Sequence, residues 1–266
     1  MCWEATPHKK YLRLAAATVG LRGQNVLEVG GCSPPALLSE HAPAKWTSVD
    51  MHPPSVASFN EKAKDLSLTN YTAMRQDIAT YEPTESYDRI YSINSFEHIS
   101  DLKSAFAGMY RALRPGGYLF TLFGPIWSSD VGHHLSLSTD KGTLYFGDGV
   151  LDPWEHLTST PEAIHVKLER QHGPRVASRA VEFIYTYPDL NRLFEHQYLS
   201  ILHESKFSPV MVVRNRKGQA PAVPGATNTR EFVWVLKKGR PSLLERASSP
   251  VKFGVAYLSS RFISAP

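Results

Sequence analysis

The sequence of 266 residues predicts an α/β fold, built as an open, doubly wound sheet. Three observations predict it. Short apolar segments alternate with helix-length stretches through residue 123, a glycine turn follows the first of these segments, and two further apolar segments lie near the end of the chain. Strands separated by helix-length segments imply right-handed crossovers and a parallel sheet that is covered by helices on both faces.

The first half of the chain gives the expected elements in a regular order. Residues 8–19 carry apolar side chains at helical spacing and are expected to form an amphipathic first helix. The segments expected to form strands are 26–29, 46–49, 71–75, 89–93 and 118–123.

In the second half, the alternation of strand segments and helix-length stretches stops. Residues 124–187 are rich in Gly, Pro, Trp and His and show no long periodic segment. This stretch is longer than an ordinary loop, which predicts a lid or substrate-binding insert. A helix is expected over 189–204, followed by strands 207–213 and 232–236 as an antiparallel hairpin.

The turn after the first strand carries most of the functional information. Gly30 and Gly31 permit a tight reversal and a close approach of the backbone to a ligand. Ser33 is expected to cap the next helix with Pro34 at its first position, so that free N–H groups face a bound molecule. Asp50 ends the second strand, where a carboxylate suits the two hydroxyls of a ribose. These features predict a nucleoside-binding βαβ unit.

From this point the chain resembles a class I S-adenosylmethionine-dependent methyltransferase with a type 11-like domain. The likeness includes an acidic residue before the glycines (Glu28), one after strand three (Asp77) and the segment Arg111-Ala-Leu-Arg-Pro-Gly-Gly117 before strand five. It implies a Rossmann-like, seven-stranded sheet with an antiparallel last strand. Cys32 and Pro34 depart from the usual pattern, because they stand where the family has its second and third glycines.

The resemblance implies S-adenosylmethionine as the cofactor. Glu28, Gly30 and Gly31 would form the turn on its methionine side, Asp50 would bind the ribose, and Asp77 the adenine amino group. The full set of cofactor-binding residues that we expect is Glu28, Gly30, Gly31, Asp50, Met51, Asp77, Ile78 and Asn94. The reaction centre would lie along residues 94–98.

An oxygen acceptor also needs a base, because a neutral hydroxyl is a poor nucleophile. Histidine titrates near neutrality, and the expected catalytic residues are His133, His134 and His98. Asp130 is close enough in sequence to orient one of these rings. In the alternative interpretation, His133 and His134 are loop residues that pack on Trp127 or meet solvent.

A divalent metal is an alternative at the same place. The segment Asn94-Ser-Phe-Glu97-His98 resembles the Glu-x-x-Glu-His segment with which some methyltransferases hold a metal. Glu97, His98 and His133 would be its ligands, with His134 as a substitute for His133. Asn94 replaces the first Glu with a weaker ligand, and the metal-free interpretation is preferred.

The amino-acid composition and the charge of the chain limit the classes of function that it could have. The hydrophobic share of 42% and the charged share of 20% are ordinary for a globular protein. The net charge of +4 is mild, and the basic runs at 214–217 and 237–240 are expected at opposite ends of the last hairpin. A nucleic-acid partner is therefore not favoured. The two cysteines, Cys2 and Cys32, suggest no disulfide framework.

The sequence therefore predicts a methyltransferase domain over 1–240, with the insert at 124–187, and a C-terminal tail over 241–266. No apolar run is long enough to span a membrane, so a cytoplasmic protein is expected. The expected acceptor is a hydroxyl on a sugar, a glycan or a small natural product, and the oligomeric state is left open. The alternatives are a non-catalytic binding protein that kept this fold and an NAD(P)-dependent oxidoreductase.

Overall fold

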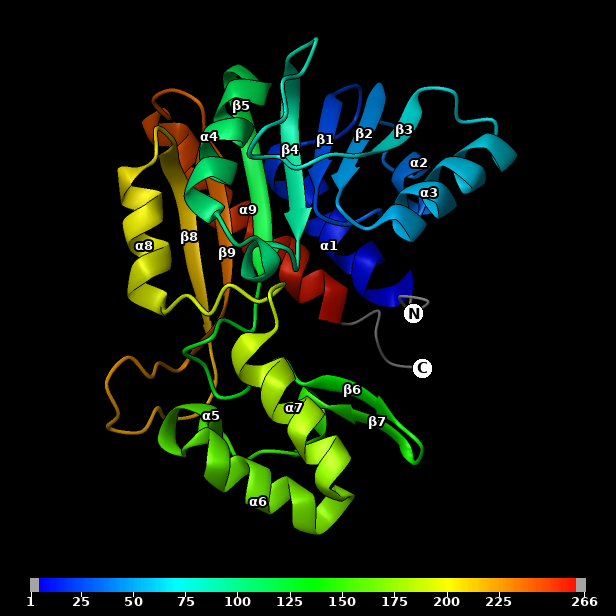
Figure 1. Ribbon diagram of the computed structural model, residues 1–266. Helices are drawn as coiled ribbons and strands as arrows, with labels where there is room; N and C mark the ends of the chain where they lie inside the picture. The colour runs from blue at the N-terminus through cyan, green and yellow to red at the C-terminus, as the bar shows by residue number, and fades with distance from the viewer. Residues whose placement is uncertain (1–4, 262–266) are drawn as a thin grey trace.

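The computed structural model describes residues 5–261 and contains a seven-stranded sheet with the order β3-β2-β1-β4-β5-β9-β8 (Figure 1). The strands are β1 (Asn25–Val29), β2 (Lys45–Asp50), β3 (Tyr71–Arg75), β4 (Tyr87–Ile93), β5 (Leu113–Phe123), β8 (Ser208–Arg216) and β9 (Thr229–Lys237). Strands β1 to β5 pair in parallel, and β9 pairs antiparallel with both β5 and β8. The predicted fold class is confirmed.

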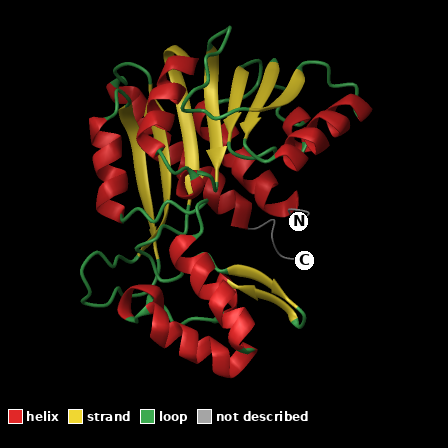
Figure 2. Ribbon diagram, viewed as in Figure 1, coloured by secondary structure: helices red, strands yellow, loops and turns green. Residues whose placement is uncertain are grey.

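Helices cover both faces of this sheet. One face packs against α4 (Leu102–Ala112) and α8 (Glu195–Glu204), and the other against α1, α2, α3 and α9 (Figures 1 and 2). The bounds of these last four helices are Ala5–Val19, Pro35–Ser39, Pro53–Asp65 and Leu243–Arg261. The interior strands are therefore buried on both sides, which explains their continuous apolar sequences.

A separate unit lies beyond the carboxyl ends of the parallel strands (Figure 1). It consists of β6 (Ser136–Thr139), β7 (Gly142–Tyr145), α5 (Glu155–Thr158), α6 (Pro161–His172) and α7 (Pro174–Thr186). Its own hydrophobic core includes Trp127, Leu168 and Ile184. Thr160 caps α6 by accepting a hydrogen bond from the Ala163 amide, with Pro161 in the first turn.

Two expectations about the second half are wrong. The segment 124–187 holds two helices of more than ten residues, although no periodic element was expected there. The helix expected from residue 189 begins only at Glu195. The packing of the tail from residue 241 could not be predicted from the sequence; the tail contains α9, and Phe253 packs into the core next to α1. Residues 262–266 and Cys2 lie outside the described part of the chain.

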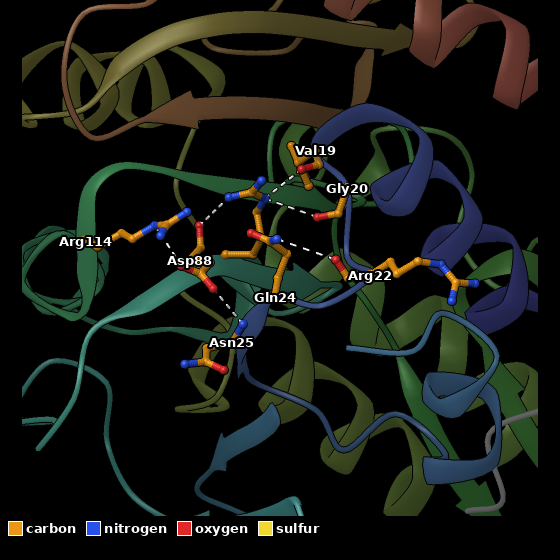
Figure 3. A network of polar contacts seen from close by, with 8 residues as sticks. Val19, Gly20, Arg22, Gln24, Asn25, Asp88 and Arg114 are labelled. Atoms are coloured by element: carbon orange, nitrogen blue, oxygen red, sulfur yellow. Dashed lines mark hydrogen bonds and ion pairs between the residues drawn. The ribbon is translucent and has the colours of Figure 1, made fainter. Parts of the chain in front are cut away.

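A polar network joins β1 and β4 at their amino ends, away from the insert (Figure 3). The Asp88 carboxylate accepts a hydrogen bond from the Asn25 amide at 2.8 Å and pairs with Arg114 at 2.7 Å. Arg89 donates to the carbonyl oxygen of Val19 at 2.6 Å. The network fixes the end of α1 against β1 and β4.

Within residues 5–261, every helix is too short or too polar to cross a bilayer.

Candidate functional site

A cavity of about 1320 Å³ lies between the carboxyl edge of the sheet and the insert. Gly30, Asp50, Asp77 and Asn94, which follow four neighbouring strands, all line it. A pocket for a single drug-sized ligand has roughly 300–1,000 Å³. The cavity therefore has room for a nucleoside and a second molecule beside it.

The glycine turn forms one wall of the cavity. Gly30 has φ of 67°, and a Cβ at this residue would lie 2.6 Å from the Cβ of Ser95. Gly31 has φ of 125°, a conformation that L side chains rarely adopt. Both glycines are therefore required by the backbone, and the turn brings main-chain atoms to the cavity surface.

Asp50 stands next to this turn at the end of β2. Its carboxylate accepts hydrogen bonds from the backbone N–H of Gly31 at 2.5 Å and of His52 at 2.6 Å. Each carboxylate oxygen keeps a second lone pair for another donor. The position and orientation of Asp50 therefore suit two ligand hydroxyls.

Glu28 lies beneath the turn and is 2% exposed, which corrects its predicted direct contact with the cofactor. Its carboxylate accepts hydrogen bonds from the amide and hydroxyl of Ser33, the indole of Trp46 and the hydroxyl of Ser48. Four neutral donors replace water around this buried charge. Glu28 thus holds the turn in shape from below.

Ser33 does not cap helix α2, which corrects a second prediction. Its hydroxyl and amide are used by Glu28, the capping position is Pro34, and the helix starts at Pro35. The N–H groups of Gly31 and Ser33 are bonded to carboxylates of the protein. Cys32 lines the cavity as a half-buried side chain, and burial raises the pKa of its thiol, so the group is neutral.

The other predicted cofactor residues lie along the same cavity. Met51, Asp77, Ile78 and Asn94 all line it. Met51 is 56% exposed, which is unusual for an apolar side chain and leaves it free to cover a bound ring. The Asp77 carboxylate accepts a hydrogen bond from the Ala79 amide at 2.8 Å, which fixes the loop after β3.

The three predicted catalytic histidines occupy different environments. His98 is exposed and lines the cavity, whereas His133 is fully buried and His134 is 7% exposed. The Nδ1 lone pair of His133 accepts a hydrogen bond from the Leu135 amide at 3.2 Å. His133 is therefore not the base, because its acceptor nitrogen is occupied inside the insert. Asp130 orients none of these rings and instead pairs with Arg230.

Glu97, His98 and His134 form one cluster, with ligand atoms of the three residues within 4.8 Å of one another. The rings of His98 and His134 meet edge to face with centroids 5.4 Å apart. His133 does not belong to this cluster, and the third member is His134, which the sequence analysis gave as the alternative to His133. Burial raises the pKa of Glu97 to about 7 and lowers the pKa of His134 to about 3.

Several residues of the cavity wall were not predicted. Tyr145 and Phe146 reach it from the end of β7, at the open end of the insert hairpin, and their ring centroids lie 4.2 Å apart. His8 and Tyr11 of α1 line the wall near the glycine turn. Only the placement of Tyr11 in an amphipathic helix was visible in the sequence, since apolar spacing shows which residues are buried but not which line a cavity.

Comparison with known proteins identifies the sheet unit. Residues 27–121 match the family model described as "Methyltransferase domain". This stretch of the chain is a methyltransferase domain by its sequence match. This domain spans the strands that carry the glycine turn, Asp50 and the Glu97 segment.

Relatives of the methyltransferase domain act on different atoms. The ubiquinone biosynthesis O-methyltransferase of Pseudomonas savastanoi pv. phaseolicola is 34% identical over 38% of this chain and 45% of its own length. The (S)-coclaurine N-methyltransferase of Papaver somniferum is 30% identical over 37% of this chain and 29% of its own. The chain thus matches less than half of the length of either relative.

A solved structure extends the likeness in fold. An S-adenosylmethionine-dependent methyltransferase from Mesorhizobium loti superimposes with a TM-score of 0.57, covering 88% of this chain and all (100%) of its own. Its sequence identity is 15%, so the similarity concerns the fold alone. The fold of the methyltransferase domain and its sequence match therefore agree.

Proposed function

We propose that this protein is an S-adenosylmethionine-dependent methyltransferase that methylates a hydroxyl of a small molecule. The observation that carries the proposal is the Gly30–Gly31 turn with the Asp50 carboxylate bonded beside it, at the cavity edge of a methyltransferase domain. When bound, the cofactor supplies a methyl group on a sulfonium, which is electrophilic. The residues of the chain bind this cofactor, orient the acceptor and take up its proton.

The cavity wall offers a group for each part of the cofactor. Asp50 has lone pairs for the ribose hydroxyls, and Asp77 has them for the adenine amino group. Met51 and Ile78 provide apolar surface for the adenine ring. Gly30 permits the close backbone approach that the methionine part needs. The thiol of Cys32, which lines the cavity, is neutral.

Without a bound metal ion, His98 is the group that takes up the acceptor proton. Its Nδ1 donates to the carbonyl oxygen of Asp189 at 2.7 Å, which leaves the lone pair of neutral imidazole on Nε2. As the acceptor oxygen takes up the methyl group that the cofactor would supply, its hydroxyl proton would pass to Nε2. Holding the two reactants in line contributes most of the rate enhancement.

The acceptor class follows from the remaining wall. Tyr145 and Phe146 present ring surface at the end of β7, and Arg230 and Glu231 add polar groups from β9. Aromatic faces stack on sugars and on flat rings, with polar groups to fix their hydroxyls. A sugar, a glycan end or a cyclic natural product would satisfy both kinds of contact.

Calorimetric titration with S-adenosylhomocysteine and, separately, with NAD⁺ tests the proposal. We expect saturable binding of S-adenosylhomocysteine only. Asp50→Ala should weaken it about 10- to 100-fold, since hydrogen bonds to a charged group contribute about 1.5–3 kcal/mol. The control is Asp65→Ala, which removes an exposed carboxylate at the end of α3 and should leave the affinity unchanged. Binding of NAD⁺ in place of S-adenosylhomocysteine would contradict the proposal.

A further inference from the structure

The Glu97, His98 and His134 cluster directs three acceptor atoms toward one another. Oε1 of Glu97 accepts a hydrogen bond from the Gly124 amide at 3.1 Å, whereas the buried Oε2 has no partner. Nδ1 of His134 is bonded to the Gly132 carbonyl oxygen at 2.8 Å, and the buried Nε2 has no partner. The structure thus leaves two buried polar atoms unsatisfied at the same place.

The tautomers of both histidines follow from these contacts. A carbonyl oxygen can only accept, so Nδ1 must carry the proton in His134 and, facing the Asp189 carbonyl, in His98. In the neutral rings the lone pair is then on Nε2. With Glu97 ionised, none of these ligand atoms carries a proton, and the ligand atoms of the three residues lie within 4.8 Å of one another.

We propose that this cluster binds a divalent transition-metal ion. Two imidazole nitrogens and one carboxylate oxygen suit zinc, iron, manganese or cobalt. Ligands about 2.1 Å from one ion lie roughly 3–3.5 Å from each other. The ligand atoms of the cluster already lie within 4.8 Å of one another, so small side-chain rotations close the site. The carbonyl bonds at both Nδ1 atoms are the supports that metal-bound histidines usually have.

The ion would have coordination positions left on the cavity side, since His98 lines the cavity wall. An acceptor hydroxyl bound there would lose its proton more readily, because a metal ion lowers the pKa of an oxygen that it binds. In that case His98 acts as a ligand and the proton leaves to solvent. This role rests on the function proposed above, whereas metal binding itself does not.

The test is a titration of tag-free protein with Co²⁺ after treatment with EDTA and removal of the chelator. We expect saturable uptake of about one ion per chain, with a visible absorption band from the bound Co²⁺. His98→Asn alters an exposed residue and should weaken uptake by at least about 10- to 100-fold, the loss that even an outer-shell change can cause. Glu97→Gln should do the same, and circular dichroism checks its fold.

His203→Asn is the matched control, because it removes an exposed histidine of α8 outside the cluster. It should bind Co²⁺ as the unaltered protein does. Absence of saturable uptake, or equal uptake by His98→Asn, would overturn the metal site. S-adenosylhomocysteine binding is measured separately on EDTA-treated protein, so failure of the metal site and failure of the proposed function give different results.

Discussion

Glu28 and Asp50 both bond to the glycine turn, but from different sides. Glu28 holds Ser33 from beneath and is itself held by Trp46 and Ser48. Asp50 holds Gly31 at the cavity surface and keeps lone pairs for a ligand. The two carboxylates look equivalent in the sequence but have different roles. Glu28 supports the turn, whereas Asp50 can bind a ligand beside it.

Left-handed backbone marks two residues around the Glu97 cluster. Asn94 has φ of 49° and His134 has φ of 51°, although neither is glycine. Such conformations persist only where the surroundings hold them and are concentrated at functional sites. Here they direct Asn94 into the cavity wall and turn His134, rather than its neighbour His133, toward His98.

His156 should make the stability of the protein depend on pH. Burial lowers its pKa to about 4, and its Nε2 is bonded to the carbonyl oxygen of Trp127 at 2.8 Å. A lowered pKa means that the unfolded chain binds more protons between about pH 6.5 and pH 4. Stability is therefore full above pH 6.5 and is lost as the pH falls toward 4.

Urea unfolding at several pH values measures this effect. We expect His156→Gln to reduce the loss of unfolding free energy between pH 6.5 and pH 4 by about 3 kcal/mol, on the basis of 1.36 kcal/mol for each pKa unit. The exposed His203→Gln should keep the pH dependence of the unaltered protein. An unchanged slope in His156→Gln would contradict the assignment.

At the scale of elements, α4 approaches the loop after β3 without any space between them. A Cβ on Gly108 would lie 1.9 Å from the carbonyl oxygen of Ile78. We expect Gly108→Ala to destabilise the protein by about 1–3 kcal/mol and to weaken S-adenosylhomocysteine binding, because Ile78 lines the cavity. Thermal unfolding and calorimetry measure the two effects.

Gly254→Ala is the control for this substitution. Gly254 lies in α9 with nothing within 4 Å of an added Cβ. The same change should there stabilise the protein by about 0.5–1 kcal/mol, since alanine favours a helix over glycine. Equal effects at both positions would show that α4 does not need the close approach.

The elements that the sequence predicted well are the strands, because interior strands of a parallel sheet are apolar throughout. The helices of the insert were missed although α7 is amphipathic. Ala177, Ala180 and Ile184 recur at helical spacing on its buried face, but the Gly and Pro content of the whole segment was given more weight than this local spacing. The spacing of Leu190 and Leu193 imitated a helix, although the two residues pack on different cores.

The site was predictable where main-chain geometry limits the residue type. Gly30, Gly31 and Asp50 lie at the cavity as expected, because turns and strand ends leave a local signature. The φ angle of one loop residue, His134, turns this histidine rather than His133 toward Glu97. The fold of the insert determines which aromatic rings line the cavity. Neither is encoded in a local pattern.

At the scale of the whole molecule, one of the links between the sheet and the segment that follows the insert is Asn191. Asn191 lies in the segment between α7 and α8, and its Nδ2 donates to the carbonyl oxygens of Phe96 at 2.5 Å and Ile99 at 3.0 Å. Its Oδ1 accepts from the hydroxyl of Tyr198 at 2.8 Å. The backbone on both sides of Glu97 and His98 is thereby fixed to this segment.

Asn191→Ala should therefore lower turnover more than cofactor affinity. We expect at least a 10-fold loss of methyl transfer and a cost of about 1–3 kcal/mol in stability, with S-adenosylhomocysteine affinity within about twofold. Steady-state kinetics and calorimetry measure these quantities. Asn70→Ala removes a similar amide-to-carbonyl bond between β2 and β3 and should leave turnover intact. Equal turnover in both variants would show that the link is only structural.

The neighbouring Arg192 completes this link from the other side. Its guanidinium donates to carbonyl oxygens at the end of α7 and lies over the ring of Trp127 in the core of the insert. The consecutive residues Asn191 and Arg192 thus bond to the sheet side and to the insert, respectively. A shift of the insert relative to the sheet would therefore move the groups that contact the acceptor. An acceptor that displaces the hairpin would leave those groups misaligned for methyl transfer. The protein would then discriminate among acceptors by their turnover rate more than by their binding affinity.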